Sequence, residues 1–267
     1  MSDSTKPPRR RPLAYKNEQF LATSDARPLR ILSEYLEPLA HFRKNGIRDT
    51  VVFFGSARVP EQGRMSEYYQ AARDLAREFT AWSERMVEEN GNRRFVVCSG
   101  GGPGIMEAAN RGASEAGGMN AGFNISLPFE QLPNPYISPE LNFEFHYFFM
   151  RKFWFAYLAK ALVAFPGGFG TLDEVMEILT LAQTQKLAKK LVIILYGTEF
   201  WSRVLNFEAL VETGMISAED LSLFQFADDT ETAMKILTEG LLKYHVKPEP
   251  ELPAIARTRV QEPGRLK

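Results

Sequence analysis

The chain has 267 residues, enough for one large domain or for one domain with tails. Its net charge of −1 argues against broad binding to nucleic acids or membrane surfaces, while 45% hydrophobic residues can supply a sizeable core. A single cysteine, Cys98, excludes an internal disulfide framework and indicates a reducing, cytoplasmic compartment.

The two ends of the chain have the composition of flexible segments. Residues 1–25 are polar, basic and contain proline, so we predict a disordered arm that is solvated rather than bound to nucleic acid. No apolar segment follows its basic residues, and no apolar run is long enough for a membrane span, so we expect neither a signal peptide nor a membrane anchor. Residues 247–267 are predicted to form a second flexible tail, which leaves residues 26–246 as one domain.

The domain is predicted to begin with a helix and a buried strand. Apolar residues at helical spacing predict the helix over residues 27–44, and residues 51–54 predict the strand. Gly55 permits a tight turn after this strand, and Ser56 and Arg58 follow it. Both are candidate ligand contacts, because ligands of open parallel sheets lie at the carboxyl ends of the strands. An exposed loop cation is an equally good interpretation of Arg58. Residues 65–90 predict a long amphipathic helix.

A second strand, residues 94–98, leads into a glycine-rich turn and a helix that continues to residue 116. The turn reads Ser99-Gly100-Gly101-Gly102-Pro103-Gly104, and Pro103 suits an early helical position. Glycines allow a ligand to approach the backbone closely, so the turn is a candidate phosphate site. Cys98 is interpreted as a buried core residue rather than as an activated thiol.

The third predicted strand covers residues 120–127 and is followed by a loop rich in proline and asparagine over residues 128–142. Asn124 is either a ligand contact or a turn-forming residue. His146 lies in an aromatic stretch, which is typical of a packed, hydrogen-bonded histidine more often than of a catalytic one.

The longest motif follows a strand predicted at residues 161–165. It reads Pro166-Gly167-Gly168-Phe169-Gly170-Thr171-Leu172-Asp173-Glu174. Thr171 is predicted to cap the next helix, which carries an apolar stripe. A strand, a glycine turn and a helix N-terminus together present free N–H groups to an anion, usually a phosphate. The motif has neither the lysine of the P-loop nor the glycine spacing of the dinucleotide fingerprint.

Two charged residues near this motif have two interpretations each. Thr171-x-x-Glu174 fits a capping box, in which the carboxylate satisfies the helix N-terminus, and fits a catalytic carboxylate equally well. Arg151 lies 15 residues before Pro166 and is followed by Lys152. Arg151 taken alone would be a solvated helix charge.

The remaining segments complete an alternation of strands and helices. Strands are predicted at residues 190–196 and 224–227, and helices at 200–211 and 230–244. This order predicts an α/β fold: a Rossmann-like, doubly wound parallel sheet with flanking helices and an extra N-terminal helix. Aromatic residues gather in residues 143–157, which makes that region a candidate dimer surface. No spacing predicts a metal site, a catalytic triad, or a flavin or nicotinamide cofactor.

The two glycine motifs and Arg151 together resemble the Lonely Guy family. Its members are cytokinin-activating phosphoribohydrolases, often labelled lysine decarboxylases, and related bacterial nucleotide 5′-monophosphate nucleosidases. Residues 166–174 match Pro-Gly-Gly-x-Gly-Thr-x-x-Glu at every fixed position, and residues 100–106 resemble Gly-Gly-Gly-x-x-Gly-x-Met. The resemblance covers roughly residues 50 to 200. Residues 149–152, Phe-Met-Arg-Lys, depart from the Met-His-Glu-Arg-Lys of short members.

The resemblance implies hydrolysis of the N-glycosidic bond of a nucleoside 5′-monophosphate, such as AMP or a cytokinin riboside monophosphate. The products would be the free base and ribose 5-phosphate, formed without a cofactor or a metal. Arg151 and Glu174 would be the catalytic pair of a cytoplasmic homodimer whose partner is a small-molecule nucleotide, not nucleic acid or a membrane. The residues expected to bind phosphate and sugar are Gly55, Ser56, Gly101, Gly102, Gly104, Met106, Glu107, Lys152, Gly167, Gly168, Gly170 and Thr171.

The alternative function is a non-catalytic carrier of a nucleotide or of the molybdenum cofactor, with the same fold. A carrier needs the phosphate contacts but has no need of Glu174. A single-strand DNA-processing protein also shares this fold, but the net charge of −1 gives DNA binding little support. A lysine decarboxylase would need a pyridoxal-binding lysine in an identifiable site, and none stands out.

Overall fold

The centre of the fold is a parallel β-sheet, as predicted. The computed structural model describes residues 11–87, 91–127, 132–187 and 189–246. In these ranges seven strands form one sheet in the order β4-β3-β2-β1-β5-β6-β7, and every neighbouring pair is parallel. The strands are β1 Thr50–Phe54, β2 Val96–Ser99, β3 Asn120–Ile125, β4 Asn142–Phe145, β5 Ala159–Ala164, β6 Val192–Tyr196 and β7 Gln225–Ala227.

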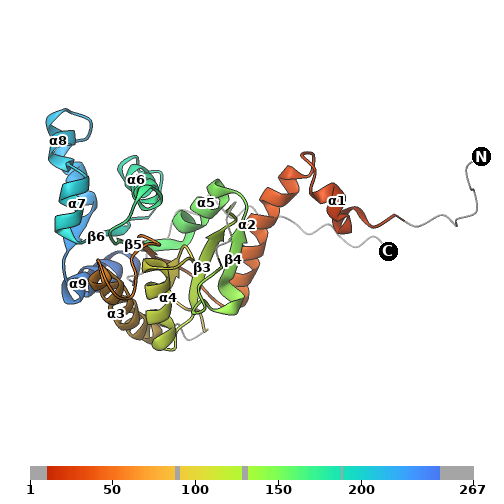
Figure 1. Ribbon diagram of the computed structural model, residues 1–267, viewed down its shortest axis with the longest axis horizontal. Helices are drawn as coiled ribbons and strands as arrows, with labels where there is room; N and C mark the ends of the chain where they lie inside the picture. The colour runs from red at the N-terminus through yellow and green to blue at the C-terminus, as the bar shows by residue number, and fades with distance from the viewer. Residues whose placement is uncertain (1–10, 88–90, 128–131, 188, 247–267) are drawn as a thin grey trace, which may run out of the picture.

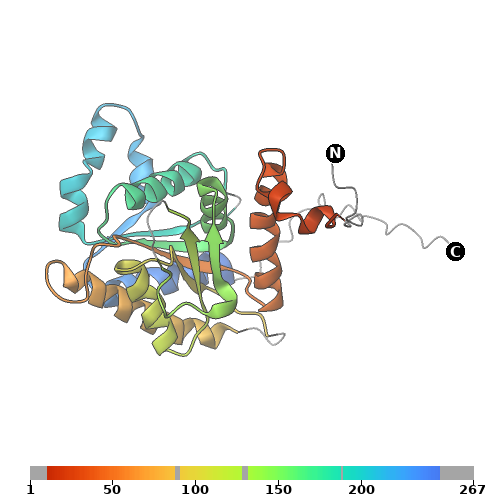
Figure 2. The same ribbon diagram turned by 45° about the vertical axis from the view of Figure 1, so that its right-hand side comes forward.

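Helices cover both faces of the sheet, which makes the fold doubly wound (Figure 1). Helices α3, α4 and α9 lie on one face, and α5 and α6 lie on the other, in both views (Figure 2). Alternate residues of β1 enter the two cores: Val51 and Phe53 join one, Val52 and Phe54 the other. The helices are α1 Glu18–Leu21, α2 Arg27–Lys44, α3 Ser66–Ser83, α4 Ile105–Glu115, α5 Phe148–Leu158, α6 Phe169–Gln183, α7 Thr198–Val204, α8 Phe207–Glu212 and α9 Thr230–Leu241.

The strand order reverses between β1 and β5. From β1 the chain builds outward through β2, β3 and β4, and it then returns to place β5 on the other side of β1. Phe54 pairs with Ala164 at the carboxyl ends of these two strands. The crossovers leave β1 and β5 in opposite directions, so a crevice opens between them, and ligands of this fold class bind there.

Several predicted elements have different bounds in the structure. The helix predicted over residues 65–90 ends at Ser83 and continues only as a short 3-10 turn, Glu84–Met86, and residues 88–90 lie outside the described ranges. The single helix predicted over residues 200–211 is two helices, α7 and α8. The break lies at Leu205, whose backbone is extended, and Asn206 caps α8 by accepting a hydrogen bond from the Ala209 N–H.

Two elements were missed by sequence analysis. Helix α5 occupies the first part of the apolar run that precedes the predicted strand at 161–165, because a run that is apolar on all sides hides helical periodicity. Strand β4 is only four residues long and adds to the edge of the sheet beside β3.

The arm predicted over residues 1–25 contains helical turns within its described part. These are Ala14–Lys16 and helix α1, which Asn17 caps by accepting a hydrogen bond from the Phe20 N–H. Arg30 of α2 donates hydrogen bonds to the carbonyls of Leu21 and Thr23, so α2 holds this segment. Residues 1–10, residues 128–131 of the predicted loop and the predicted tail 247–267 lie outside the described ranges.

We predict that Gly112→Ala destabilises the domain, although alanine is normally the better helix residue by about 1 kcal/mol. Gly112 lies inside α4, where a Cβ atom would be 2.0 Å from the Arg73 carbonyl oxygen of α3. The two helices would have to move apart, so we expect a loss of about 2 kcal/mol or more in the free energy of unfolding. Denaturant titration measures it. Ser114→Ala, at an exposed position of the same helix, is the control and should be neutral or slightly stabilising. A Gly112→Ala protein as stable as its parent would contradict this account of the α3–α4 packing.

Candidate active site

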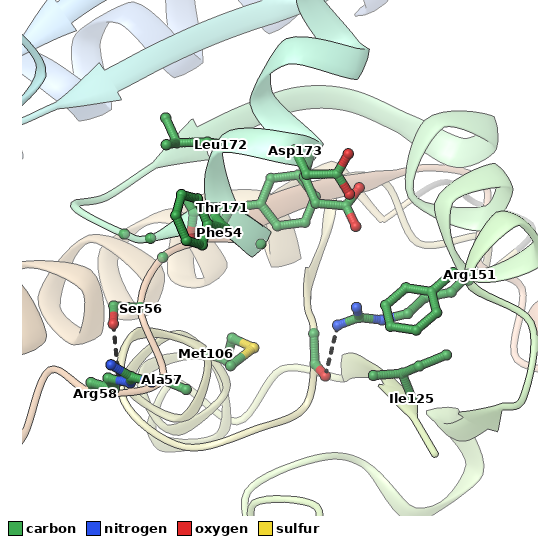
Figure 3. A pocket seen from close by; sticks show the side chains of 18 of the residues that line it. Phe54, Ser56, Ala57, Arg58, Met106, Ile125, Arg151, Thr171, Leu172 and Asp173 are labelled. Carbon is green, nitrogen blue, oxygen red and sulfur yellow. Dashed lines mark hydrogen bonds between the residues drawn. The ribbon is translucent and has the colours of Figure 1, made fainter. Parts of the chain in front are cut away.

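A cavity of about 800 Å³ lies at the carboxyl ends of the central strands. Its wall is formed by the turns after β1 and β5, by the ends of β2 and β3, and by helices α5 and α6. Arg151 lies at one end of the cavity and Ser56 and Arg58 at the other, with Met106 between them (Figure 3). The reversal of strand order therefore produces one site from segments that are far apart in the sequence.

The turns after β1, β2 and β5 are joined by main-chain hydrogen bonds. The Ser56 N–H donates to the Pro166 carbonyl at 3.0 Å, and the Ser56 carbonyl accepts from the Ile105 N–H at 3.1 Å. Gly104 has φ +68°, and a Cβ atom there would be 2.4 Å from the Ser56 carbonyl oxygen. Only glycine fits this position, both for its backbone conformation and for the space around it.

Helix α6 begins differently from the sequence prediction. Its N-cap is Gly168, which offers no capping side chain, and its first residue is Phe169. Thr171 is therefore the third helical residue and not the cap, so the predicted capping is wrong. A Cβ atom at Gly168 or Gly170 would meet nothing within 4 Å. The helix N-terminus thus faces open space at the cavity, with backbone N–H groups accessible to an anion.

This start of α6 removes the capping-box interpretation of Glu174. A capping box places its carboxylate at the third helical residue, and Glu174 is the sixth. The side chain of Glu174 is only 8% exposed and lines the cavity. Burial raises the pKa of Glu174 from 4.5 to about 7, and the positive charges of Arg151 and Lys152 oppose that rise. A carboxyl group with a pKa near neutrality, in a cleft and beside a cation, is typical of a functional group.

Arg151 reaches the same cavity from α5. Its Nε donates to the Phe123 carbonyl at 2.7 Å and one Nη to the Gly100 carbonyl at 3.4 Å. Burial lowers the pKa of Arg151, and the charge of Glu174 raises it in part. The hydrogen bonds fix the guanidinium at the ends of β2 and β3, so Arg151 is a held, half-buried cation and not a solvated one.

The structure brings most of the predicted site residues together at this cavity. Glu107 instead accepts a hydrogen bond from the Tyr69 hydroxyl at 2.9 Å, and Lys152 pairs with Asp173 at 2.7 Å and with Glu177 at 2.9 Å. The predicted residues that line the cavity are Gly55, Ser56, Met106, Arg151, Gly167, Gly168, Gly170, Thr171 and Glu174. The predicted residues that do not line it are Gly101, Gly102, Gly104, Glu107 and Lys152.

Among the residues with two interpretations, Arg58 and Asn124 line the cavity. The amide of Asn124 donates to the Asn142 side chain and to the Phe143 carbonyl, so it also joins β3 to β4. The ring of His146 packs at the edge of the Tyr147 ring, and His146 does not line the cavity.

Sequence analysis missed most of the apolar wall. Phe54, Phe148 and Phe200 line the cavity from β1, α5 and α7, and only their tertiary placement identifies them. Phe169 lies inside the recognised motif, and its side chain is 93% exposed at the mouth of the cavity. The cavity therefore combines an open helix N-terminus, charged side chains of both signs and an apolar surface.

The described residues were also compared with the requirements of a metal site, a membrane span and a reactive thiol. Within it, no group of three or more His, Cys, Asp or Glu side chains is arranged to hold a metal ion. None of the helices in the same ranges combines the length and the apolar character that a membrane span requires. Cys98 is fully buried, and burial raises the pKa of its thiol, as expected of a core cysteine.

The raised pKa of Glu174 predicts a pH-dependent difference in stability. Between pH 4.5 and about 7 the folded protein keeps this proton while the unfolded chain releases it. The stability that the neutral carboxyl contributes is present below pH 4.5 and is lost as the pH rises through 7. Glu174→Gln does not titrate, so it should gain about 2–3 kcal/mol relative to the parent between pH 5 and pH 8. Denaturant titrations at the two pH values measure the difference. Glu208→Gln, on the exposed surface of α8, should show no such change, and an equal response of both variants would refute the raised pKa.

Comparisons with known proteins show which sequences and folds the chain is similar to. The sequence model of a family described as "Possible lysine decarboxylase" matches residues 106–237. The cytokinin riboside 5′-monophosphate phosphoribohydrolase LOG of Oryza sativa subsp. japonica is 28% identical over 207 residues, 76% of this chain and 78% of the relative. LOG3 of Arabidopsis thaliana is 28% identical over 203 residues, 74% of this chain and 85% of the relative.

Two solved structures share the fold. The X-ray structure of TM1055, a structural genomics target, has a TM-score of 0.50 at 23% identity and covers 72% of this chain and 99% of its own. The molybdenum cofactor binding protein of the bacterium Rippkaea orientalis has a TM-score of 0.50 at 18% identity and covers 72% and 97%. At these identities the likeness concerns the fold alone. The relatives and the family model agree with the resemblance to the Lonely Guy family that the two glycine motifs predict.

Proposed function

We propose that the protein hydrolyses the N-glycosidic bond of nucleoside 5′-monophosphates and releases the free base and ribose 5-phosphate. The observation that carries the proposal is the placement of Glu174. It is buried, it has no capping role, and it shares a cavity with Arg151 and with the open N-terminus of α6. The plant relatives are named as phosphoribohydrolases of cytokinin riboside 5′-monophosphate, which supports the same reaction class.

The phosphate would bind at the start of α6. Gly168 and Gly170 leave space there, and the backbone N–H groups of the first turn are accessible to an anion. Arg58, at the same end of the cavity as Ser56, adds a positive charge. Binding of this remote phosphate would hold the ribose within reach of the catalytic pair, so that binding energy is used for positioning.

The reaction would proceed through an oxocarbenium-like transition state. As the bond between C1′ and the base breaks, positive charge develops on the ribose, and the anionic carboxylate of Glu174 stabilises it. The same carboxylate orients the water that adds to C1′, and the proton that this water releases ends on the departing base. Arg151, held by two carbonyl groups, orients the ribose, and its positive charge lowers the pKa of Glu174 and so favours the anion.

The apolar part of the cavity fits an aromatic base. Phe54, Ile125 and Phe148 lie on its wall, and such side chains pack against a planar ring without reading its edge. AMP or a cytokinin riboside monophosphate is therefore the proposed substrate, and no metal or cofactor takes part in the proposed reaction. We propose a homodimer, because α5 exposes aromatic side chains next to the site, including Phe149, Phe153 and Tyr157. A cytoplasmic location is proposed from the single cysteine.

The rival function is a carrier of an anionic ligand such as the molybdenum cofactor. The shared fold is compatible with it. The cavity gives it less support, because a buried carboxylate serves no purpose in holding an anionic ligand, whereas hydrolysis needs one near the ribose. Glu174 therefore favours catalysis over transport.

The proposal predicts that the 5′-phosphate is essential. AMP should be cleaved, whereas adenosine should lose roughly 10²-fold or more in kcat/KM, because the contacts at the start of α6 would be lost. Chromatography detects the release of adenine and ribose 5-phosphate from AMP. The same assay on a panel of purine, pyrimidine and cytokinin monophosphates measures which base is preferred. Comparable rates on AMP and adenosine would contradict a phosphate site, and turnover of neither would contradict the proposed reaction.

The proposal also predicts which charged side chains are needed for turnover. Arg151→Ala and Glu174→Gln should each lower kcat by at least ~10²-fold, since each removes a charge that acts on the ribose. Lys152→Ala is the matched control. It deletes the neighbouring cation, which does not line the cavity and pairs with Asp173 and Glu177, and it should have a milder effect. Both cavity variants should still bind phosphate-containing ligands, as seen by ligand-dependent melting. An active Glu174→Gln enzyme would contradict a catalytic role of Glu174. A Lys152→Ala enzyme that loses more turnover than Arg151→Ala would contradict the choice of Arg151 as the catalytic cation.

A further inference from the structure

Helix α2 precedes the sheet in the sequence but packs against α5, the helix that carries Arg151 (Figure 1). The ring of Tyr35 stacks on Trp154 with centroids 5.9 Å apart, and Trp154 is fully buried. Phe42 packs on the same indole ring at 5.5 Å. This contact joins the segment ahead of the sheet directly to the wall of the site.

One residue of α2 makes three hydrogen bonds across this contact. The carboxylate of Glu34 accepts from the His146 N–H at 2.9 Å and from the Tyr147 N–H at 3.3 Å. Its main-chain carbonyl accepts from the indole N–H of Trp154 at 2.8 Å. The three donors stand on both sides of Arg151 in the sequence.

The start of α5 has no capping group of its own. Tyr147 is the N-cap and makes no capping hydrogen bond through its side chain, and the first turn contains no acidic residue. A negative charge is favourable at this end of a helix. Glu34 supplies that charge from α2, and it fixes the two residues through which the chain enters α5.

A short chain of bonds leads from Glu34 to the cavity. The Tyr147 N–H is held by Glu34, and the Tyr147 carbonyl accepts the N–H of Arg151 at 3.2 Å. The guanidinium at the far end of Arg151 is anchored on the Phe123 carbonyl. The backbone of Arg151 is thus set by α2, while its side chain is set by the sheet.

We infer that Glu34 is a positioning residue for Arg151. Glu34 touches neither the cavity nor the reacting atoms. It determines where the first turn of α5 starts and so where the guanidinium stands relative to the ribose. The inference rests on the proposed function, in which Arg151 acts on the bound ribose, and it gives α2 a role in catalysis beyond stability.

The test compares two glutamates of α2. Glu34→Ala should lower kcat on AMP by about 10- to 10²-fold with KM changed by less than a few fold, because a small displacement of a catalytic group affects the transition state most. Glu34→Gln keeps one acceptor oxygen and should recover part of the loss. Glu37→Ala, at an exposed position of the same helix, should leave kcat unchanged. If Glu34→Ala does not fold, Glu34→Gln carries the test, with an expected loss of about threefold or more.

A double variant separates positioning from stability. In the Arg151→Ala protein there is no guanidinium to place, so adding Glu34→Ala should change kcat by less than about twofold. A loss by the same factor in both backgrounds would overturn the inference, as would a Glu34→Ala enzyme with the kcat of the parent.

Hydrogen exchange gives a reading that does not depend on turnover. Amides of residues 148–155 should exchange faster in Glu34→Ala than in the parent or in Glu37→Ala, because α5 loses its anchored start. A parent protein that cleaves no nucleotide would refute the proposed function. Unchanged exchange in α5 of Glu34→Ala would refute the inference about Glu34 itself.

Discussion

The main chain of Ser56 holds the site together. Its N–H and carbonyl connect the end of β1 to the turn after β5 and to the first residue of α4. Such a close approach of three backbones requires that no Cβ atom stands between them, and Gly104 meets this condition. Because β1 is the central strand, these bonds determine how far apart the two glycine turns lie and therefore the size of the cavity.

The turn after β2 is held by a buried polar network. The Ser99 hydroxyl accepts from the Gly101 N–H and donates to the Asn110 side chain at 2.6 Å. The Asn134 side chain donates to the Gly101 carbonyl and to Asn110, which ties the segment after β3 to the same turn. Buried polar groups that satisfy one another in this way fix a single conformation. The turn is therefore rigid before any ligand arrives, which is the condition for preorganised binding.

Burial and the nearby cations have opposite effects on the pKa of Glu174, and the resulting value suits catalysis. Burial favours the neutral form of Glu174, whereas Arg151 and Lys152 favour the anion. The result is a carboxyl group that changes its charge near neutral pH, at some cost to stability above that pH. Active sites commonly hold such destabilising groups, which the surrounding fold keeps in place. Here α6 carries Glu174 and α5 carries Arg151, and the packing of these helices on one face of the sheet keeps the pair in the same cavity.

The parallel sheet, the two glycine turns and the candidate pair Arg151 and Glu174 could all be predicted from the sequence. Buried strands and glycine clusters have local signatures, and the family motif is local as well. The sequence prediction placed the cap of α6 at Thr171, whereas the N-cap is Gly168, about one turn earlier. The pattern Thr-x-x-Glu is the same in both cases, so it does not show where the helix begins. That Glu174 and Arg151 line the same cavity is visible only in the tertiary structure. It also revealed that Glu34 reaches donors 112, 113 and 120 residues away. Contacts at such separations depend on how complete elements pack, and no local pattern records them.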